Sequence, residues 1–137
     1  MHLIDTDVLS ALRRRERHPG IARWVSEQGA TDLYLSVVSI GEVERGIRQQ
    51  QRKNPPFARA LATWLDRVMS FYGERILGVD LATARRWGQL SAALGHEGAD
   101  LLIAATALEH GLTVVTCNVR HFEPTGVEIV DPSIESH

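Results

Sequence analysis

Four polar residues stand at equivalent points along the chain, each directly after an expected strand or in the first turn of the helix that follows one. They are Asp5, Glu42, Asp100 and Asn118. Because the carboxyl ends of parallel strands and the starts of the following helices share one edge of a sheet, we expect these side chains to converge in one crevice. Carboxylates held close together repel one another and need a cation, and oxygen ligands favour Mg²⁺ or Mn²⁺. A metal ion held in this way suits hydrolysis of a phosphodiester.

Each of these residues also has a purely structural interpretation. Ser39 and Glu42 have the spacing of a capping box, in which Ser39 is the N-cap and Glu42 reaches back to its amide. Asp100 complements a helix macrodipole, and Asn118 suits a turn. Asp5 is the hardest to explain in this way, because an acid that closes an apolar central strand needs a partner. Spacing alone therefore does not decide between a metal site and a set of unrelated helix caps.

The elements that must position these residues alternate between strands and helices. We expect strands at 2–5, 33–37, 76–79, 112–116 and 127–130, and helices at 6–15, 19–28, 39–53, 57–71, 81–94 and 99–110. This alternation predicts an α/β fold with a central parallel sheet and helices on both faces. No repeat or long linker divides the chain, so we expect one domain over 1–137 with a frayed tail over the last few residues.

The composition is that of an ordinary globular protein whose net charge does not by itself attract nucleic acid. The 137 residues are 44% hydrophobic and carry a formal charge of −2, so RNA binding has to come from local patches. No apolar run is long enough to span a membrane, and we expect no signal peptide. Cys117 is the only cysteine, which excludes an internal disulfide and predicts a reducing cytoplasm.

Basic residues are mostly arginine and gather in two runs, at 13–17 and 45–53. Arginine suits bidentate contacts with phosphate, but the same runs are ordinary solvated helix ends. Both interpretations stay open at this point. Trp24, Trp64 and Trp87 lie among apolar residues at helical spacing, and we expect them in the core or facing a partner rather than stacking on bases.

Four segments, in order and at the right separations, resemble the motifs of PIN-domain nucleases. They are Leu3–Ser10, Ser39–Ile47, Ala99–Ala107 and Thr113–Phe122. The first resembles the apolar-apolar-Asp-Thr-Asn/Asp-Val opening, and the third resembles Asp-x-x-Ile-Ala-Ala-x-Ala. The resemblance covers the whole chain. It is strongest to the VapC-type toxins of bacterial toxin–antitoxin pairs, which include the related FitB type.

This resemblance implies the toxin of a type II toxin–antitoxin system, a Mg²⁺-dependent endoribonuclease that cuts tRNA or ribosomal RNA. It further implies a cytoplasmic homodimer, away from membranes, that a cognate VapB-like antitoxin neutralises. The positions that match Asp5, Glu42 and Asp100 are the family's acidic site residues, and Asn118 matches the fourth position, which is Asp or Asn. Thr116 matches a hydroxyl position just before it. The expected catalytic set is therefore Asp5, Glu42, Asp100 and Asn118.

Two departures from the family pattern bear on the metal. Asn118 is neutral, and His121 stands where many relatives carry an Asp. We therefore expect one Mg²⁺, replaceable by Mn²⁺, held by Asp5, Asp100 and Asn118, and the sequence leaves a second metal open. Supporting roles are expected for three further residues, Thr6, Asp7 and Thr116.

Two other functions stay in view. The neutral Asn118 allows a catalytically weak PIN-fold module that binds RNA or antitoxin without cutting. The segment Asp5-Thr6-Asp7 also resembles the Asp-x-Asp start of haloacid-dehalogenase-type phosphatases. Those enzymes need a lysine late in the chain and an acidic pair, whereas Lys53 is the only lysine here and no Asp-Asp pair exists. The phosphatase is the more remote alternative.

Overall fold

The computed structural model describes residues 1–134 and contains one five-stranded parallel sheet. Its strands are β1 (His2–Ile4), β2 (Leu33–Ser36), β3 (Ile76–Leu77), β4 (Thr113–Val115) and β5 (Ile129–Val130). Their order across the sheet is β3-β2-β1-β4-β5, and every neighbouring pair is parallel. The expected α/β fold is confirmed. The part of the expected frayed tail at 135–137 lies outside the described residues.

Helices connect the strands. The α-helices are α1 (Thr6–Ala11), α2 (Pro19–Ser26), α3 (Val37–Lys53), α4 (Pro55–Tyr72), α5 (Leu81–Leu94), α6 (Ala99–His110) and α7 (Val119–Phe122). Short 3₁₀ segments lie at η1 (Leu12–Arg17), η2 (Ala30–Asp32), η3 (Gly73–Arg75) and η4 (Glu123–Thr125). Within the described residues, no helix is long and apolar enough to cross a membrane.

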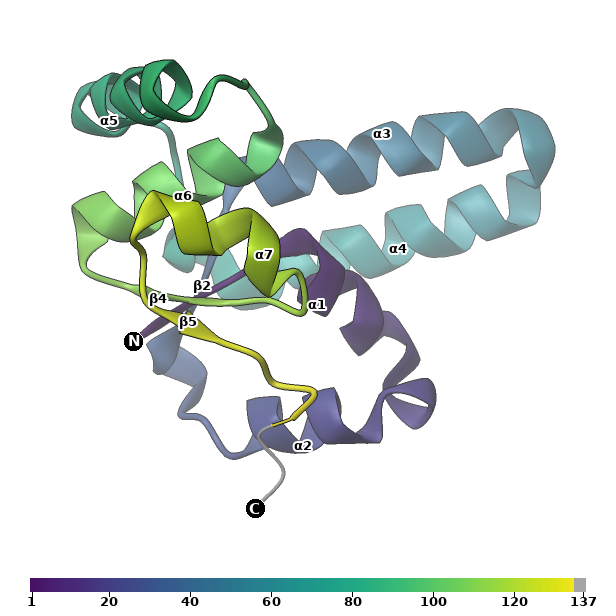
Figure 1. The fold of residues 1–137 in the computed structure, drawn as a ribbon. Helices are drawn as coiled ribbons and strands as arrows, with labels where there is room; N and C mark the ends of the chain where they lie inside the picture. Colours follow the sequence, from purple (N-terminus) through teal and green to yellow (C-terminus); the bar gives the residue numbers. More distant parts are fainter. Residues whose placement is uncertain (135–137) are drawn as a thin grey trace.

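Helices cover both faces of the sheet, as the sequence predicts. Alternate residues of a strand point to opposite faces, and β1 follows this rule. Leu3 belongs to a buried cluster with residues of α6 and α7, whereas Ile4 belongs to a cluster with residues of α1, α2, α3 and α4. The ribbon shows the two groups on either side of the strands, with α3 and α4 extending from the body as an antiparallel pair (Figure 1). The central strand β1 is therefore buried from both sides.

The strand order places a crevice between β1 and β4. The chain builds outward from β1 through β2 to β3, and then returns to the other side of β1 to add β4 and β5. At such a switch point the connections leave the sheet in opposite directions, and open α/β sheets bind their ligands there, at the carboxyl ends of the strands. Asp5 follows β1 at this point, and Asn118 follows β4.

Several expected boundaries differ from the structure by two or more residues, and one short helix was not expected. The helix expected at 39–53 begins at Val37, because Ser36 is its N-cap and accepts a hydrogen bond from the Val38 amide at 3.0 Å. The helix expected at 6–15 ends at Ala11 and continues as the 3₁₀ segment η1. The short helix α7 was not expected at all. These differences are local and leave the topology unchanged.

Candidate active site

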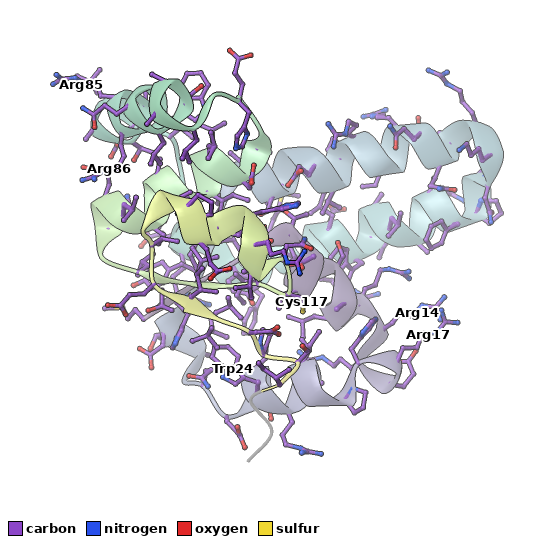
Figure 2. All side chains as sticks on the ribbon, viewed as in Figure 1. Arg14, Arg17, Trp24, Arg85, Arg86 and Cys117 are labelled. Carbon is purple, nitrogen blue, oxygen red and sulfur yellow. The ribbon has the colours of Figure 1, made fainter. Side chains whose placement is uncertain are left out.

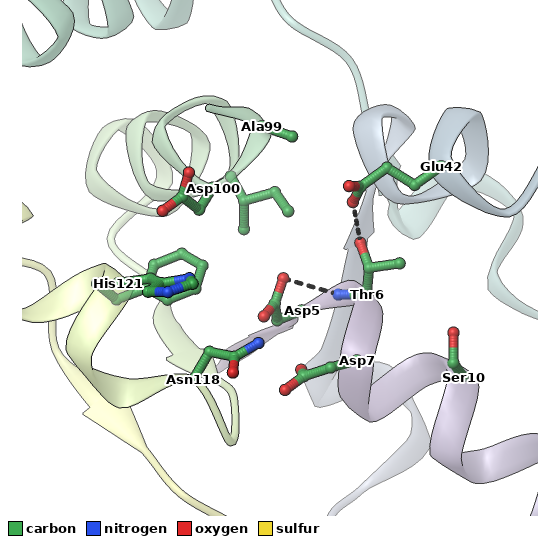
Figure 3. Close-up of a pocket in the computed structure, with 11 residues that line it drawn as sticks. Asp5, Thr6, Asp7, Ser10, Glu42, Ala99, Asp100, Asn118 and His121 are labelled. Carbon is green, nitrogen blue, oxygen red and sulfur yellow. Dashed lines mark hydrogen bonds between the residues drawn. The ribbon is translucent and has the colours of Figure 1, made fainter. Parts of the chain in front are cut away.

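A single open cavity of about 400 Å³ lies at the switch point and contains all of the expected catalytic residues. Its polar lining comprises Asp5, Thr6, Asp7, Ser10, Glu42, Asp100, Asn118 and His121. The close-up shows Asp5 on the floor, Glu42 on the α3 side and Asp100 on the α6 side (Figure 3). Residues that are up to 113 positions apart in the sequence thus share one site, as their places at strand ends predict.

Asp5 is held on both of its carboxylate oxygens. The backbone amide of Thr6 donates to Oδ1 at 2.8 Å, and the Thr116 hydroxyl donates to Oδ2 at 2.8 Å. Asp5 is 7% exposed and Thr116 is fully buried, so this contact joins the end of β1 to the end of β4 below the cavity floor. The orientation of the carboxylate is therefore fixed before any ligand arrives.

The environment of Asp5 favours its protonated form. Burial, and after it the nearby negative charge of Asp7, together raise the pKa of this carboxyl from 3.8 to about 7. The hydrogen bond from Thr116 opposes the change but does not cancel it. A buried acid beside a second acid is stabilised in its charged form by a cation. This electrostatic imbalance indicates where a positive charge would bind.

Glu42 is positioned through Thr6. The Thr6 hydroxyl donates to Glu42 Oε1 at 2.5 Å, and the Thr6 hydroxyl oxygen also lies 2.8 Å from the hydroxyl oxygen of Ser39. Thr6 has one hydroxyl proton, so when it donates to Glu42 the Ser39 hydroxyl must donate to Thr6. The expected capping box between Ser39 and Glu42 is wrong, because the helix begins three residues earlier at its Ser36 cap.

Asp7 ties the loop after β4 to the first helix. Its Oδ1 accepts from the Val8 amide at 2.7 Å, and its Oδ2 accepts from the Cys117 amide at 3.1 Å. The first bond lies within the first turn of α1, whose N-cap is Asp5. The second fixes the backbone directly before Asn118, so Asp7 supports the fourth site position and also adds its charge to the cavity.

Asp100 enters the cavity from the first turn of α6, and Gly98 makes room for it. Gly98 is the N-cap of α6, and a Cβ at that position would lie 2.5 Å from Asp100 Oδ1. No real side chain tolerates such an approach, so only glycine lets the carboxylate lie where it does. The expected helix-dipole placement of Asp100 is confirmed, since it occupies the second residue of the helix.

Asn118 lies beside the floor of the cavity and is held by Thr116. The backbone N–H of Asn118 donates to the Thr116 hydroxyl oxygen at 2.9 Å, and the backbone carbonyl of Asn118 accepts from the His121 backbone N–H at 3.0 Å. Thr116 therefore accepts from the Asn118 backbone amide and donates to Asp5, the contacts that a supporting residue would make. His121 follows on α7 and lines the same cavity.

The donor set suits a hard divalent cation, although the acids are not gathered around one point. Asp5, Asp7, Asp100 and Asn118 offer only oxygen ligands, which Mg²⁺ and Mn²⁺ prefer. Within residues 1–134, no three His, Cys, Asp or Glu side chains lie close enough together to hold an ion. Glu42 is turned toward Thr6, across the cavity from Asp100 (Figure 3). An ion would thus have to draw the carboxylates inward.

The sequence did not predict the roles that Ser39 and Gly98 have in this site. Ser39 was noticed, but it was assigned to the helix cap rather than to Thr6. Gly98 lies between the helices expected at 81–94 and 99–110, and its position two residues before Asp100 was the available signal. The link from Asp7 to the Cys117 amide had no signal in the sequence, because it joins positions 110 residues apart.

Comparison with known proteins gives consistent matches over nearly the whole chain. A family model described as PIN domain matches residues 2–126. The plasmid stability protein StbB of Pseudomonas syringae pv. tomato is 31% identical, over 96% of this chain and 98% of its own length. The VapC ribonuclease Y4jK of Sinorhizobium fredii is 30% identical, over 96% of this chain and 97% of its own length.

The structural comparison agrees. Toxin FitB of Neisseria gonorrhoeae is 28% identical, over 96% of this chain and 98% of its own length. The crystal structure of FitAcB from the same bacterium superposes with a TM-score of 0.85 at 29% identity, and the match covers 96% of this chain and 98% of that chain. The sequence match to FitB and the structural match to FitAcB each cover 96% of this chain.

Proposed function

This chain belongs to the PIN domain family, and from that premise we propose that it is a metal-dependent endoribonuclease, the toxin of a type II toxin–antitoxin pair. Its relatives include proteins named VapC ribonuclease and toxin FitB, both matched along almost their whole length. The chain is accordingly a PIN-domain toxin of this group and a nuclease. The metal requirement and the kind of RNA that is cut are the parts of the proposal that go beyond this assignment.

One observation carries the catalytic part of the proposal. The four positions singled out by their places in the sequence line one cavity, at the point of the sheet where ligands bind. Four unrelated caps would have no reason to face the same space. The haloacid-dehalogenase alternative has no support in this cavity, because no lysine lines it.

The residues that would hold Mg²⁺ are Asp5, Asp100 and Asn118, with Mn²⁺ as a substitute. When bound, the ion would supply an activated water and stabilise charge on the phosphate. Asp5 is the principal ligand in this proposal, because it lies at the buried floor of the cavity, where burial and the charge of Asp7 raise its pKa to about 7 and disfavour its charged form without a cation. Near neutral pH, cation binding would therefore displace a proton from part of the population.

The remaining residues orient the site. Thr116 and the Thr6 amide fix the two oxygens of Asp5, so that its lone pairs face the cavity in a set direction. The Thr6 hydroxyl fixes Glu42 on the opposite wall, where its carboxylate can orient or accept a proton from a water that approaches the phosphate. Because these side chains are already oriented, little energy is spent on rearranging them when the transition state forms.

The partners follow from the toxin assignment. We propose a cognate VapB-like antitoxin as the inhibitor, a homodimer as the state of the toxin, and the bacterial cytoplasm as its location. The substrate is RNA, and tRNA or ribosomal RNA are the species to test first. Complex formation with the antitoxin and the mass of the free toxin in solution would check the first two statements directly.

The central experiment is cleavage of a total tRNA and ribosomal RNA pool by the purified protein. We expect cleavage with Mg²⁺, loss of cleavage with EDTA, and recovery when Mg²⁺ or Mn²⁺ is restored. Asp5→Asn should abolish cleavage while the protein stays folded. Asp66→Asn, a change of the same kind on the exposed face of α4, should leave cleavage unchanged and serves as the matched control.

The results distinguish the two functions that remain. Cleavage that survives both EDTA and Asp5→Asn would contradict the metal-nuclease mechanism. Absence of cleavage of every RNA, with retained antitoxin binding, would instead support the catalytically weak binding module that the neutral Asn118 leaves open. Mapping the 5′ ends of the products would then identify the RNA target.

A further inference from the structure

A second hollow of about 250 Å³ continues from the acidic cavity along the junction of α1, α3 and α4. The two share Thr6, Ser10 and Glu42 in their linings, so they adjoin each other. We call the second hollow the side groove. Its remaining lining consists of Arg13, Val43, Gly46, Leu61 and Trp64.

Gly46 keeps the side groove open. It lies in the middle of α3, where glycine is less favourable than alanine. A Cβ built at Gly46 would meet nothing within 4 Å, and its φ angle is not in the left-handed region. Neither close packing nor backbone conformation therefore requires a glycine here. The space beside it is free for a ligand.

Arg13 supplies a positive charge at the side groove. Its guanidinium lies over the ring of Phe57, 4.9 Å from the centroid, and makes no ion pair within residues 1–134. Burial and the charges of Arg14 and Arg17 both lower the pKa of Arg13. Arg14 and Arg17 extend outward from the same segment (Figure 2), and among the described residues only Glu16 approaches this cluster, 3.9 Å from Arg14.

These features fit a nucleotide better than a protein helix. The groove is too small for an α-helix, whose diameter with side chains is about 10–12 Å. Its combination of an arginine with a half-buried indole suits a phosphate and a base, since single-stranded nucleic acids bind through backbone charge and stacking. We propose that the side groove holds the nucleotide adjoining the scissile phosphate of a single-stranded RNA, with a phosphate at Arg13 and a base against Trp64.

This proposal rests on the proposed ribonuclease function and deepens it, because it names the strand and the side from which the RNA enters. Trp64 packs against the core, as the sequence predicts, and in this proposal its exposed part also contacts a base. The acidic cavity then receives the phosphate to be cut, while the side groove fixes its neighbour. RNA in a paired helix could not enter both at once without unstacking.

Binding of a short fluorescein-labelled single-stranded RNA in EDTA, followed by anisotropy, tests the groove apart from catalysis. Gly46→Leu fills the groove and should raise Kd at least about tenfold without lowering Tm, since nothing packs against that position. Arg13→Gln should raise Kd about fivefold and reduce the slope of log K against log salt by about one. A loss of folding would not change that slope selectively.

Matched variants on the opposite side of the molecule control for helix and charge effects. Gly88→Leu places the same side chain at an open position in the middle of α5. Arg85→Gln removes an exposed arginine that extends from α5, far from Arg14 and Arg17 (Figure 2). Both should bind and cleave RNA like the unmodified protein.

The outcomes separate this proposal from the function on which it rests. If the protein cleaves RNA, but Gly46→Leu and Arg13→Gln bind RNA with unchanged affinity and salt slope, the groove proposal is overturned and the nuclease stands. If these variants weaken only the binding of the antitoxin, the groove belongs to the protein partner and the proposal is again overturned. If they weaken RNA binding and the protein never cleaves, the groove stands and the nuclease falls.

Discussion

The Thr6 hydroxyl donates a hydrogen bond to Glu42 Oε1 at 2.5 Å, and this bond links the first turn of α1 to the second turn of α3. Thr6 thereby positions two residues of the site, because its backbone amide also donates to Asp5 on the cavity floor. Behind it, the fully buried Ser39 donates to the Thr6 hydroxyl and sets the direction in which that hydroxyl points. The orientation of Glu42 thus depends on a residue that does not line the acidic cavity.

Ser39→Ala should lower kcat for RNA cleavage about three- to tenfold with little change in KM. The reason is that Thr6 loses its donor, its hydroxyl rotates more freely, and Glu42 is held less firmly, an effect comparable to one hydrogen bond of about 0.5–1.5 kcal/mol. Steady-state cleavage of a defined RNA substrate measures this. Ser39→Thr keeps the hydroxyl and should restore part of the rate.

Ser36→Ala is the matched control for Ser39→Ala, because both serines are fully buried at the start of the same helix. Loss of the Ser36 cap should lower the free energy of unfolding by about 1 kcal/mol and leave kcat nearly unchanged. Equal loss of activity in the two variants at equal stability would contradict the positioning role of Ser39.

Asp5→Asn should stabilise the metal-free protein at pH 8. The folded-state pKa of Asp5 is about 7, above its ordinary value of 3.8, so the folded state loses stability as pH rises through this interval. A shift of this size corresponds to about 4 kcal/mol at pH 8, because each pKa unit corresponds to about 1.4 kcal/mol. Asn removes that penalty, and the difference between the proteins should shrink as pH falls from 7 toward 4. Urea unfolding at several pH values measures it.

Mg²⁺ gives a second measurement on the same pair of proteins. The ion favours the charged form of Asp5, so it should raise the Tm of the unmodified protein at pH 8 and raise that of Asp5→Asn much less. A stability difference between the two proteins that does not vary with pH would show that Asp5 already carries its charge in the folded protein.

Thr116→Val should reduce both cleavage and stability. Valine has a similar shape, but it removes the donor to Asp5 and the acceptor for the Asn118 amide. An unsatisfied buried amide costs about 1–3 kcal/mol, and Asp5 loses one of its two fixed contacts. Thr106→Val is the matched control, since Thr106 is equally buried but donates only to the Leu102 carbonyl within its own helix. Urea unfolding and cleavage assays on both variants separate the two effects.

The residues that converge on the site could be predicted because their positions follow from the sheet itself. Apolar runs that end in Asp5 and Asn118 indicate buried parallel strands, and parallel strands bring their carboxyl ends to one edge. The same pattern predicts helices on both faces. None of this depends on side-chain conformation, which explains why it could be predicted from local sequence.

The start of α3 could not be predicted, because two serines three residues apart are equally good N-caps. The structure selects Ser36, which pairs with Leu77 as the last residue of β2, so the helix can begin directly after it. That choice frees Ser39 for Thr6. The break at Arg14, where φ is −127° and ψ is 64°, likewise has no glycine or proline to announce it. Both features depend on contacts between segments.

Gly98→Ala should reduce cleavage strongly with little effect on folding. The new methyl group would lie 2.5 Å from Asp100 Oδ1, so the carboxylate has to leave its position in the cavity. Displacement of a catalytic group by about 1 Å can cost about a hundredfold in rate. The backbone at Gly98 has φ of −59°, which alanine adopts without strain, so Tm should change little. Gly88→Ala, at an open position within α5, should leave the rate unchanged and raise stability slightly. Full activity of Gly98→Ala would mean that the observed position of Asp100 is not the one that acts on RNA.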